Sequence, residues 1–262
     1  MEDSNKDTIP WNSRIVQVVL LCTTLAPLGV PLISPALPAI RDHFNITDFQ
    51  ASLLISSYFV IGIILSPFIG AIIDRIGRKV VLISSLFVFS MSGSIIFFTQ
   101  HYTMILLLRV LQGTSAAGLF ITTATLIGDT FDGIQRSAIF GMNNAALSLG
   151  AATFPIIGGI LVQYHWKVPF LVYLLGLPLA VFALKVLEEP MKDATRKSQK
   201  SYISNTLKMI KKREMILPYS SSILTEVLLF GAIFTLLPFI LIEKFGGSSV
   251  YVGSILSITS LV

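Results

Sequence analysis

The stretch Gly70-Ala-Ile-Ile-Asp74-Arg-Ile-Gly77-Arg-Lys79-Val-Val-Leu82 places four charged residues within six positions, between two long runs with almost no charge. Gly70 and Asp74 are one helical turn apart, so they share a face of a predicted helix. A glycine on that face allows a second backbone to approach closely, and the carboxylate beside it is predicted to face the N-terminal end of a neighbouring helix. Gly77 permits the tight reversal into the next helix.

We interpret this turn as a latch, in which a carboxylate clasps a partner when two helix bundles close together. A simple basic loop is the alternative. It explains the cations, but it does not explain why an apolar helix ends in Gly-x-x-x-Asp. The residues of the predicted conformational latch are Gly70, Asp74, Arg75, Gly77, Arg78 and Lys79.

The composition of the whole chain is that of a membrane protein. Of its 262 residues, 53% are hydrophobic and 13% are charged, and the mean hydropathy is +0.80; a soluble domain is typically about 25% charged. A helical run of roughly 20 apolar residues crosses a hydrocarbon core of about 30 Å. Seven runs are predicted to do so, at 15–40, 49–73, 80–98, 103–127, 137–163, 168–184 and 215–242. An eighth, from residue 248 onward, is too short to span comfortably.

The distribution of cations predicts the orientation of these spans. If the N-terminus lies in the cytoplasm, most of the 19 Lys and Arg residues fall in the cytoplasmic segments between spans. The exceptions are Arg109, which lies within a span, and Arg41, Lys167 and Lys244, which lie in outer segments. This pattern follows the positive-inside rule and predicts a multi-pass protein of the cell membrane with a cytoplasmic N-terminus. The net charge of +5 reflects the same loop bias and requires no nucleic-acid partner.

The chain divides into three predicted parts. Residues 1–187 hold six spans, residues 188–217 form a basic cytoplasmic linker, and residues 218–262 begin a second bundle. The 202–215 part of the linker is amphipathic, which suits a helix lying on anionic lipid. A solvated linker helix fits that pattern equally well.

An internal repeat is predicted within the first six spans. Pro67 and Gly70 recur at an offset of 88 as Pro155 and Gly158, in two spans that run in opposite directions. A three-span repeat of inverted topology is a signature of secondary transporters. Chance recurrence of proline and glycine in membrane helices is the alternative.

The charged turn and three further motifs resemble those of the major facilitator superfamily. Gly-x-x-x-Asp-Arg-x-Gly-Arg-Lys at 70–79 resembles its signature loop between spans two and three, and Arg109-Val-Leu-Gln-Gly113 resembles its span-four motif. Residues 150–159 resemble the span-five motif of its drug–proton antiporters, with Phe154 where that motif usually has glycine. Residues 165–170 resemble its entry to span six.

The resemblance covers residues 15–262 and implies an all-α membrane fold. That fold has an N-terminal six-helix bundle of two inverted three-helix repeats, followed here by helix 7 and a partial helix 8. The resemblance also implies a helix-bending and packing motif in span five, made of Gly150, Pro155, Gly158 and Gly159.

Two charged residues lie inside predicted spans, where a charge costs on the order of 3 kcal/mol. Arg109 shares one helical stripe with Gln112 and Gly113, and the resemblance implies a role in proton coupling and in organising the cavity. An arginine that snorkels to the outer interface is the alternative. Glu226 in span seven is predicted to carry a proton or to contact a cationic substrate, or else to bond a neighbour. A direct Arg109–Glu226 pair is not expected, because the two enter from opposite faces.

Uncharged polar residues add to the predicted cavity, and the sequence lacks the motifs of an enzyme. Asn143 and Asn144 in span five line the cavity or bond between helices. The predicted proton-coupling or cavity residues are Arg109, Gln112, Gly113, Asn143, Asn144 and Glu226. The sequence has no Walker loop, metal-ligand cluster or nucleophile triad, so no enzyme activity, cofactor or metal is predicted.

The resemblance implies a secondary active transporter that moves a small molecule by alternating access, with proton-coupled efflux of a drug or metabolite as the first hypothesis. Uptake of a metabolite by symport is the second. A hypothesis of another class is a truncated chain that does not transport, or a half that needs a separate partner chain. The partners expected are therefore a small-molecule substrate, protons, membrane lipids and a C-terminal half; the sequence does not identify the substrate.

Overall fold

The chain is built from helices. The computed structural model describes residues 13–188 and 213–260, and all regular structure in these ranges is helical. This confirms the predicted all-α fold, while the predicted amphipathic segment 202–215 lies largely outside the described residues. The elements in chain order are α1 (Arg14–Leu25), η1 (Ala26–Gly29), η2 (Ser34–Ala36), α2 (Leu37–Phe44), α3 (Asp48–Ile76), α4 (Arg78–Ile95), η3 (Ile96–Phe98), α5 (Tyr102–Thr130), α6 (Gly133–Val162), η4 (Val168–Leu175), α7 (Gly176–Val186), α9 (Arg213–Glu226), η5 (Val227–Leu236), α10 (Leu237–Phe245) and α11 (Ser249–Thr259).

Seven stretches of the described chain are long and apolar enough to cross a membrane, as predicted. Their bounds are Arg14–Phe44, Asp48–Ile76, Arg78–Phe98, Tyr102–Thr130, Gly133–Val162, Val168–Val186 and Ser220–Phe245. The last helix, α11, is apolar but shorter, as the sequence predicts for the eighth run. The chain is therefore a multi-pass membrane protein.

The first span is broken in its middle. Pro27, Pro31, Pro35 and Pro38 have no amide hydrogen and cannot donate a helical hydrogen bond, so α1 gives way to the short 3₁₀ segments η1 and η2 before α2 begins. Every residue from 26 to 38 is buried. Non-helical backbone at membrane depth is tolerated only where protein or a water-filled cavity surrounds it, and here protein does so.

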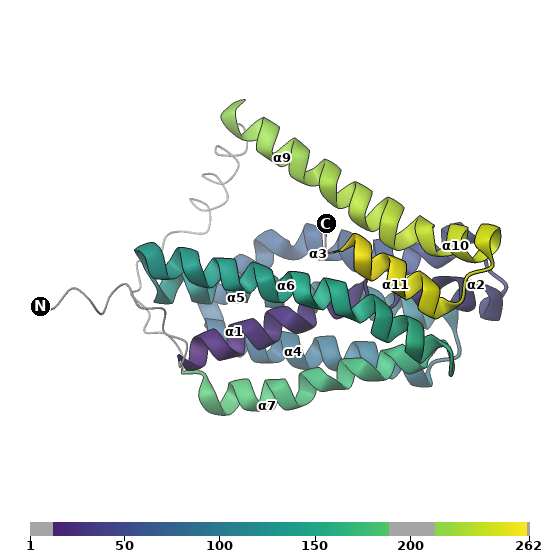
Figure 1. Ribbon diagram of the computed structural model, residues 1–262. Helices are drawn as coiled ribbons and strands as arrows, with labels where there is room; N and C mark the ends of the chain where they lie inside the picture. The colour runs from purple at the N-terminus through teal and green to yellow at the C-terminus, as the bar shows by residue number, and fades with distance from the viewer. Residues whose placement is uncertain (1–12, 189–212, 261–262) are drawn as a thin grey trace, which may run out of the picture.

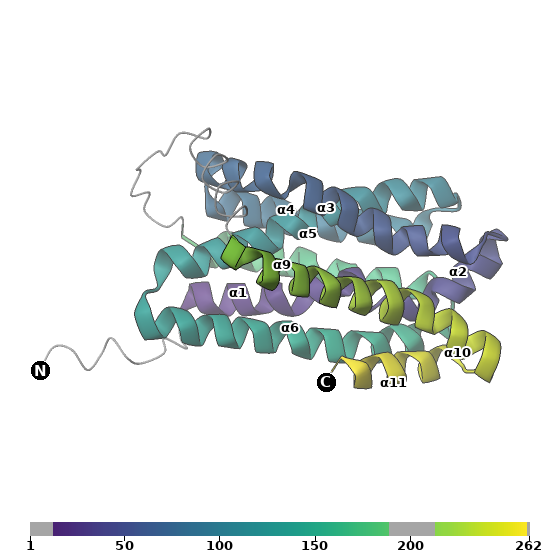
Figure 2. The same ribbon diagram turned by 90° about the horizontal axis from the view of Figure 1, so that it is seen from above.

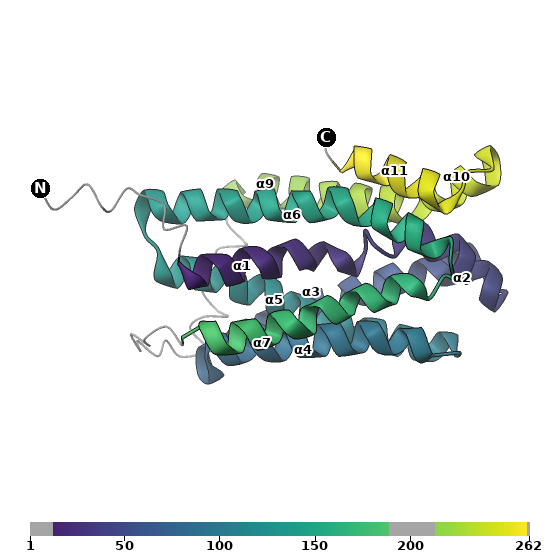
Figure 3. The ribbon, with the colours of Figure 1, turned by 60° about the horizontal axis from the view of Figure 1, so that its bottom comes forward.

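The long helices lie side by side, with their axes roughly along one direction (Figure 1). α5 packs between α3 and α4, α7 packs on α4 and α1, and α6 lies against α1 on one side and α11 on the other. α10 and α11 thus lie on the far side of α6 from α7 and α4 (Figure 3).

The seventh span leans away from the other helices at one end. α9 diverges from the bundle at its beginning, on the side of the molecule where the chain starts, whereas α10 returns to contact α2 at the other end (Figure 1). Seen from above, α9 lies over the space between α3 and α6 (Figure 2). The two groups of helices are therefore closer together at the α2–α10 end than at the opposite end.

Glycine on α5 lets α3 pack directly against it. A side chain at Gly113 would overlap the backbone carbonyl oxygen of Tyr58, and one at Gly62 would lie 3.1 Å from the Gly113 carbonyl oxygen. The two backbones are therefore in contact, as small residues allow between membrane helices.

We predict that Gly113→Ala lowers the melting temperature of the protein in detergent, because the added methyl group forces α3 and α5 apart; overpacking of this kind typically costs about 1–3 kcal/mol. Gly128→Ala is the matched control on the same helix, since a Cβ there meets no atom within 4 Å. Equal melting temperatures for the two variants would contradict the packing described.

Candidate functional site

A buried arginine occupies the centre of the first six spans. Arg109, on α5, has no exposed surface. Its Nη1 donates to the Gly29 carbonyl oxygen at 2.8 Å and to Gln112 Oε1 at 2.8 Å, and it lies 3.3 Å from the Tyr173 hydroxyl. These partners come from the first, fourth and sixth spans, so the guanidinium joins three helices.

The arginine and the tyrosine together bond the broken part of the first span. The Tyr173 hydroxyl donates to the Leu28 carbonyl oxygen at 2.7 Å, next to the Gly29 carbonyl that Arg109 bonds. Because the prolines remove amide donors from this segment, its carbonyl groups need partners from elsewhere, and bare backbone in hydrocarbon costs several kcal/mol per group. The Arg109 guanidinium, at membrane depth, therefore supplies a hydrogen-bond donor to the backbone of the first span.

The rest of the guanidinium is enclosed by aromatic rings. Arg109 Cζ lies 5.7 Å from the centre of the Tyr58 ring and 5.8 Å from that of Phe170, distances at which a cation is attracted to a ring face. Its Nε and Nη2 have no hydrogen-bond partner among the described residues. Arg109 therefore does not snorkel to the interface, and the alternative of an interfacial arginine is wrong.

The stripe predicted beside Arg109 is buried together with it. Gln112 and Gly113 are both buried, and Gln112 Nε2 donates to the Phe89 carbonyl oxygen at 3.4 Å. These side chains form an internal network rather than the surface of an open cavity. As expected, Glu226 is not among the hydrogen-bond partners of Arg109.

The remaining predicted cavity residues lie apart from this network. The Thr23 hydroxyl donates to Asn143 Oδ1 at 2.5 Å, which links α1 to α6, whereas Asn144 is exposed. Glu226 is exposed as well, at the last position of α9, where the π-helical stretch η5 begins. Glu226 lies within the seventh span, Ser220–Phe245, as predicted, but no other helix covers its side chain, because α9 leans away from the bundle.

The charged turn joins three helix ends on the same side of the molecule. α3 ends at Ile76, Gly77 has a φ of 105°, and α4 begins at Arg78. Arg78 lies 3.6 Å from Asp74 and donates through Nε to Asp129, at the end of α5, at 2.9 Å. The positive φ explains the need for glycine, since other residues are strained there.

The predicted partner of the latch is not found among the described residues. Asp74 pairs with Arg78 on the neighbouring helix, and its side chain is 62% exposed. A Cβ at Gly70 would meet no atom within 4 Å, so no second backbone approaches it. Asp74 thus lies beside the N-terminus of α4, whose first residue is Arg78, and Gly70 faces open space.

The glycines of α6 bring two other segments into backbone contact. On one side, a side chain at Gly150 would lie 2.6 Å from the Thr24 carbonyl oxygen, and one at Gly158 would overlap the Leu32 carbonyl. The broken first span therefore rests directly on α6.

On its other side, α6 carries α11. A side chain at Gly159 would overlap the Ser249 carbonyl, and one at Gly253 would overlap the carbonyl of Pro155, which lies inside α6. The motif predicted to bend and pack the fifth span therefore contacts the first span through Gly150 and Gly158, and α11 through Pro155 and Gly159.

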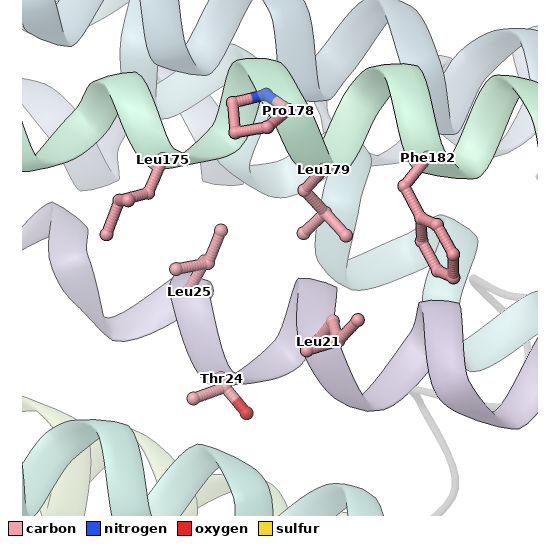
Figure 4. A pocket seen from close by; sticks show the side chains of 7 residues that line it. All are labelled: Leu21, Thr24, Leu25, Leu175, Pro178, Leu179 and Phe182. Atoms are coloured by element: carbon pink, nitrogen blue, oxygen red, sulfur yellow. The ribbon is translucent and has the colours of Figure 1, made fainter.

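A groove between α1 and α7 contains none of the predicted functional residues (Figure 4). Its one polar side chain, Thr24, uses its hydroxyl to bond the Leu20 carbonyl oxygen of its own helix at 2.8 Å. The groove is therefore apolar and suits lipid chains rather than a polar solute. The lining residues are Leu21, Thr24, Leu25, Leu175, Pro178, Leu179 and Phe182.

A sequence model described as Major Facilitator Superfamily matches residues 19–262. The chain belongs to this superfamily. The resemblance predicted from the charged turn is thereby confirmed. Members of the Major Facilitator Superfamily are transporters rather than enzymes, which agrees with the prediction that the chain has no enzyme activity.

Curated relatives in the superfamily include exporters and resistance proteins. The chain is 35% identical over 150 residues to the bacillibactin exporter of Bacillus subtilis (strain 168), covering 55% of this chain and 37% of the relative. It is 28% identical to multidrug resistance protein 2 of the same strain, covering 98% of this chain and 66% of the relative. It is 29% identical to quinolone resistance protein NorA of Staphylococcus aureus (strain MRSA252), covering 78% of this chain and 52% of the relative. The chain thus spans less than two thirds of each relative.

Solved structures of other superfamily transporters share the fold. One is a bacterial homologue of the human lysosomal transporter Spinster in an inward-facing, unoccupied conformation, with a TM-score of 0.78 at 15% identity over 97% of this chain and 60% of that one. Another is a D-xylose–proton symporter, with a TM-score of 0.70 at 15% identity, covering 95% of this chain and 65% of that one. These likenesses confirm the fold expected for the superfamily.

Sequence reasoning missed Tyr173. A single tyrosine in the otherwise apolar sixth span is a signal that it bonds a buried group, since a buried phenol hydroxyl usually finds a partner. What the sequence lacks is the identity of that partner, the Leu28 carbonyl 145 positions away.

We predict that Tyr173→Phe destabilises the protein by about 1–3 kcal/mol, because it leaves the buried Leu28 carbonyl without its donor. Thermal unfolding in detergent measures the change. Tyr164→Phe, at a residue that is 79% exposed, is the control and should have no effect. A tyrosine-to-phenylalanine change that is equally harmless at both positions would show that the hydroxyl does not support the broken span.

Proposed function

We propose that the chain carries out secondary active export of a small molecule by alternating access, driven by a proton gradient. The observation that supports this most is its likeness, over 98% of its length, to multidrug resistance protein 2, together with its likeness to the bacillibactin exporter. Because the chain spans only part of each relative, the proposal is for this chain together with any helices that complete the transporter.

The geometry supports a rocking motion between two groups of helices. Gly159 on α6 and Gly253 on α11 bring the two helices into backbone contact, and we take this contact as the point about which the last helices pivot. α9 already leans away at one end while α10 stays in contact at the other (Figure 1). We propose that this conformation opens the path at the end where α9 diverges.

The domain division and the sidedness follow from the same proposal. Residues 1–187 would act as one rigid bundle and 218–262 as the beginning of its partner, with the N-terminus in the cytoplasm of a cell whose plasma membrane holds the protein. The charged turn at 70–79 then faces the cytoplasm. There it would serve as a latch, with Asp74 leaving Arg78 for a partner on the second bundle when that end closes.

Proton coupling is assigned to Glu226, with Arg109 as a positioning residue. Glu226 stands at the junction of α9 and the π-helical stretch, and π-helical segments occur frequently at functional sites. No other helix covers it while the α9 end is open, so water that enters at that end would exchange a proton with it, and closure would carry it toward the bundle. Arg109 keeps the broken span in place through both states.

We predict that Glu226→Gln abolishes transport driven by a pH gradient but preserves equilibrating flux down a substrate gradient, because a glutamine cannot carry the proton. Proteoliposomes with and without an imposed pH gradient measure the two fluxes. Asp132→Asn, at a side chain that is 95% exposed and pairs with Arg136, is the control. Gradient-driven transport that survives in Glu226→Gln would contradict the assignment.

The proposed export is tested with the substrates that the relatives' names provide. In everted membrane vesicles, accumulation of a fluoroquinolone or of bacillibactin on imposing an inward-acidic pH gradient, abolished by a protonophore, is the expected result. The chain is assayed alone and co-expressed with the complementary helices of multidrug resistance protein 2. Gradient-dependent flux in the opposite direction would favour symport instead, and no flux of either compound in any arm, with correctly inserted protein, would refute the proposal for these substrates.

A further inference from the structure

A charge cluster joins the first six spans to the last helices at the end where α2, α3 and α10 meet. Its centre is Arg41, near the end of α2. Arg41 Nη1 bonds Asp48 Oδ1, in the first turn of α3, at 2.8 Å, and it also bonds Glu243 Oε1 on α10. Its Nε bonds Asp42 Oδ1 at 2.9 Å. One cation therefore holds three carboxylates from three helices.

The guanidinium of this cluster is fixed more firmly than its partners. The Arg41 side chain is only 18% exposed, and its Cζ lies 5.5 Å from the centre of the buried Phe239 ring on α10. Asp48 and Glu243 are 49% and 51% exposed. Arg41 thus packs against α10 through a ring as well as through a charge, while the carboxylates face solvent.

Two further contacts below the cluster close the same end. The Ser34 hydroxyl donates to the Phe234 carbonyl oxygen, and the rings of Phe59 and Phe230 lie 4.5 Å apart. Both contacts pair the first spans with η5. They add a hydrogen bond and an aromatic contact to the ion pairs that join the two groups of helices at this end.

We propose that Arg41 is the central residue of an ionic gate at the α2–α10 end of the substrate pathway. The gate is closed while Arg41 bonds both Asp48 and Glu243, and it opens when Glu243 separates from Arg41. The inference rests on the proposed alternating access. Exposed ion pairs are individually weak, so such a gate biases the conformation without locking it. Arg41 is a positioning residue, because it acts through the carboxylates that it holds and so favours closure of this end.

The physical consequence is a population shift. Removing the pair leaves the α6–α11 contact intact but withdraws the charge attraction at one end. The ratio of closed to open molecules at that end should then fall by up to about five-fold, which is the effect of losing one exposed ion pair. In the molecules that open at the α2–α10 end, the opposite end, where α9 diverges, should close.

Distances between spin labels in lipid nanodiscs test the gate. Phe49 on α3 and Phe245 on α10, 72% and 69% exposed, are labelled as cysteines for the gate end. Ile76 on α3 and Leu217 on α9, 55% and 77% exposed, report on the other end. The chain has one natural cysteine, Cys22, which is buried and is replaced by serine.

The expected result is a longer 49–245 distance in both Arg41→Gln and Glu243→Gln, with no further change in the double variant, because the two side chains act as one pair. Lys244→Gln, which removes the neighbouring charge on α10, is the control and should leave the distance unchanged. Arg41→Lys should lie between, since it keeps the charge but loses the planar fork. A 49–245 distance that is equal in Arg41→Gln, Glu243→Gln and Lys244→Gln would overturn the proposal.

Salt gives a second test that needs no gate variant. Raising the ionic strength from 0.1 M to 1 M shortens the screening length from about 10 Å to about 3 Å and should lengthen the 49–245 distance in the labelled chain. An unchanged distance would overturn the gate. If the 49–245 distance lengthens while the 76–217 distance stays constant, the ionic gate stands and the proposed alternation of the two ends fails.

Discussion

The need to bond the backbone of the broken first span constrains the rest of the structure. Four prolines remove donors from a segment that lies at membrane depth, where no water can replace them. Arg109 and Tyr173 bond two of the carbonyls of this segment. The fourth and sixth spans are therefore tied to the first, and the charge that looked costly in the sequence stabilises backbone that hydrocarbon would otherwise leave bare.

Two kinds of contact hold the helices together: backbone contacts at glycines along the helices and charged clusters at the helix ends. Glycines on α5 and α6 bring the backbones of neighbouring helices into direct contact. Charged clusters lie at the ends, around Arg78 on one side and Arg41 on the other. Long apolar contacts fix which helices are neighbours, and weak ionic contacts at the rims adjust how far the ends separate.

The fold was largely predictable from the sequence, because span length, the prolines of the first span and Gly77 are local signals. The site was predictable only in part. Arg109 stands out as a charge in a span, but its partners Gly29 and Tyr173 depend on tertiary packing that no local pattern encodes. Glu226 lies in a span as expected, but how much of its side chain other helices cover depends on how far α9 leans, which no local pattern encodes. Gly70 signals a close contact that no described residue makes.

The most direct test of this account is the distance between the Arg109 guanidinium and the Gly29 carbonyl in a lipid bilayer. Solid-state NMR of the protein with guanidino-¹⁵N arginine and carbonyl-¹³C glycine measures the dipolar coupling between the two groups, and Arg109→Lys identifies the signal by its loss. The account predicts a coupling that corresponds to a direct hydrogen bond. Absence of any coupling that Arg109→Lys removes would contradict it.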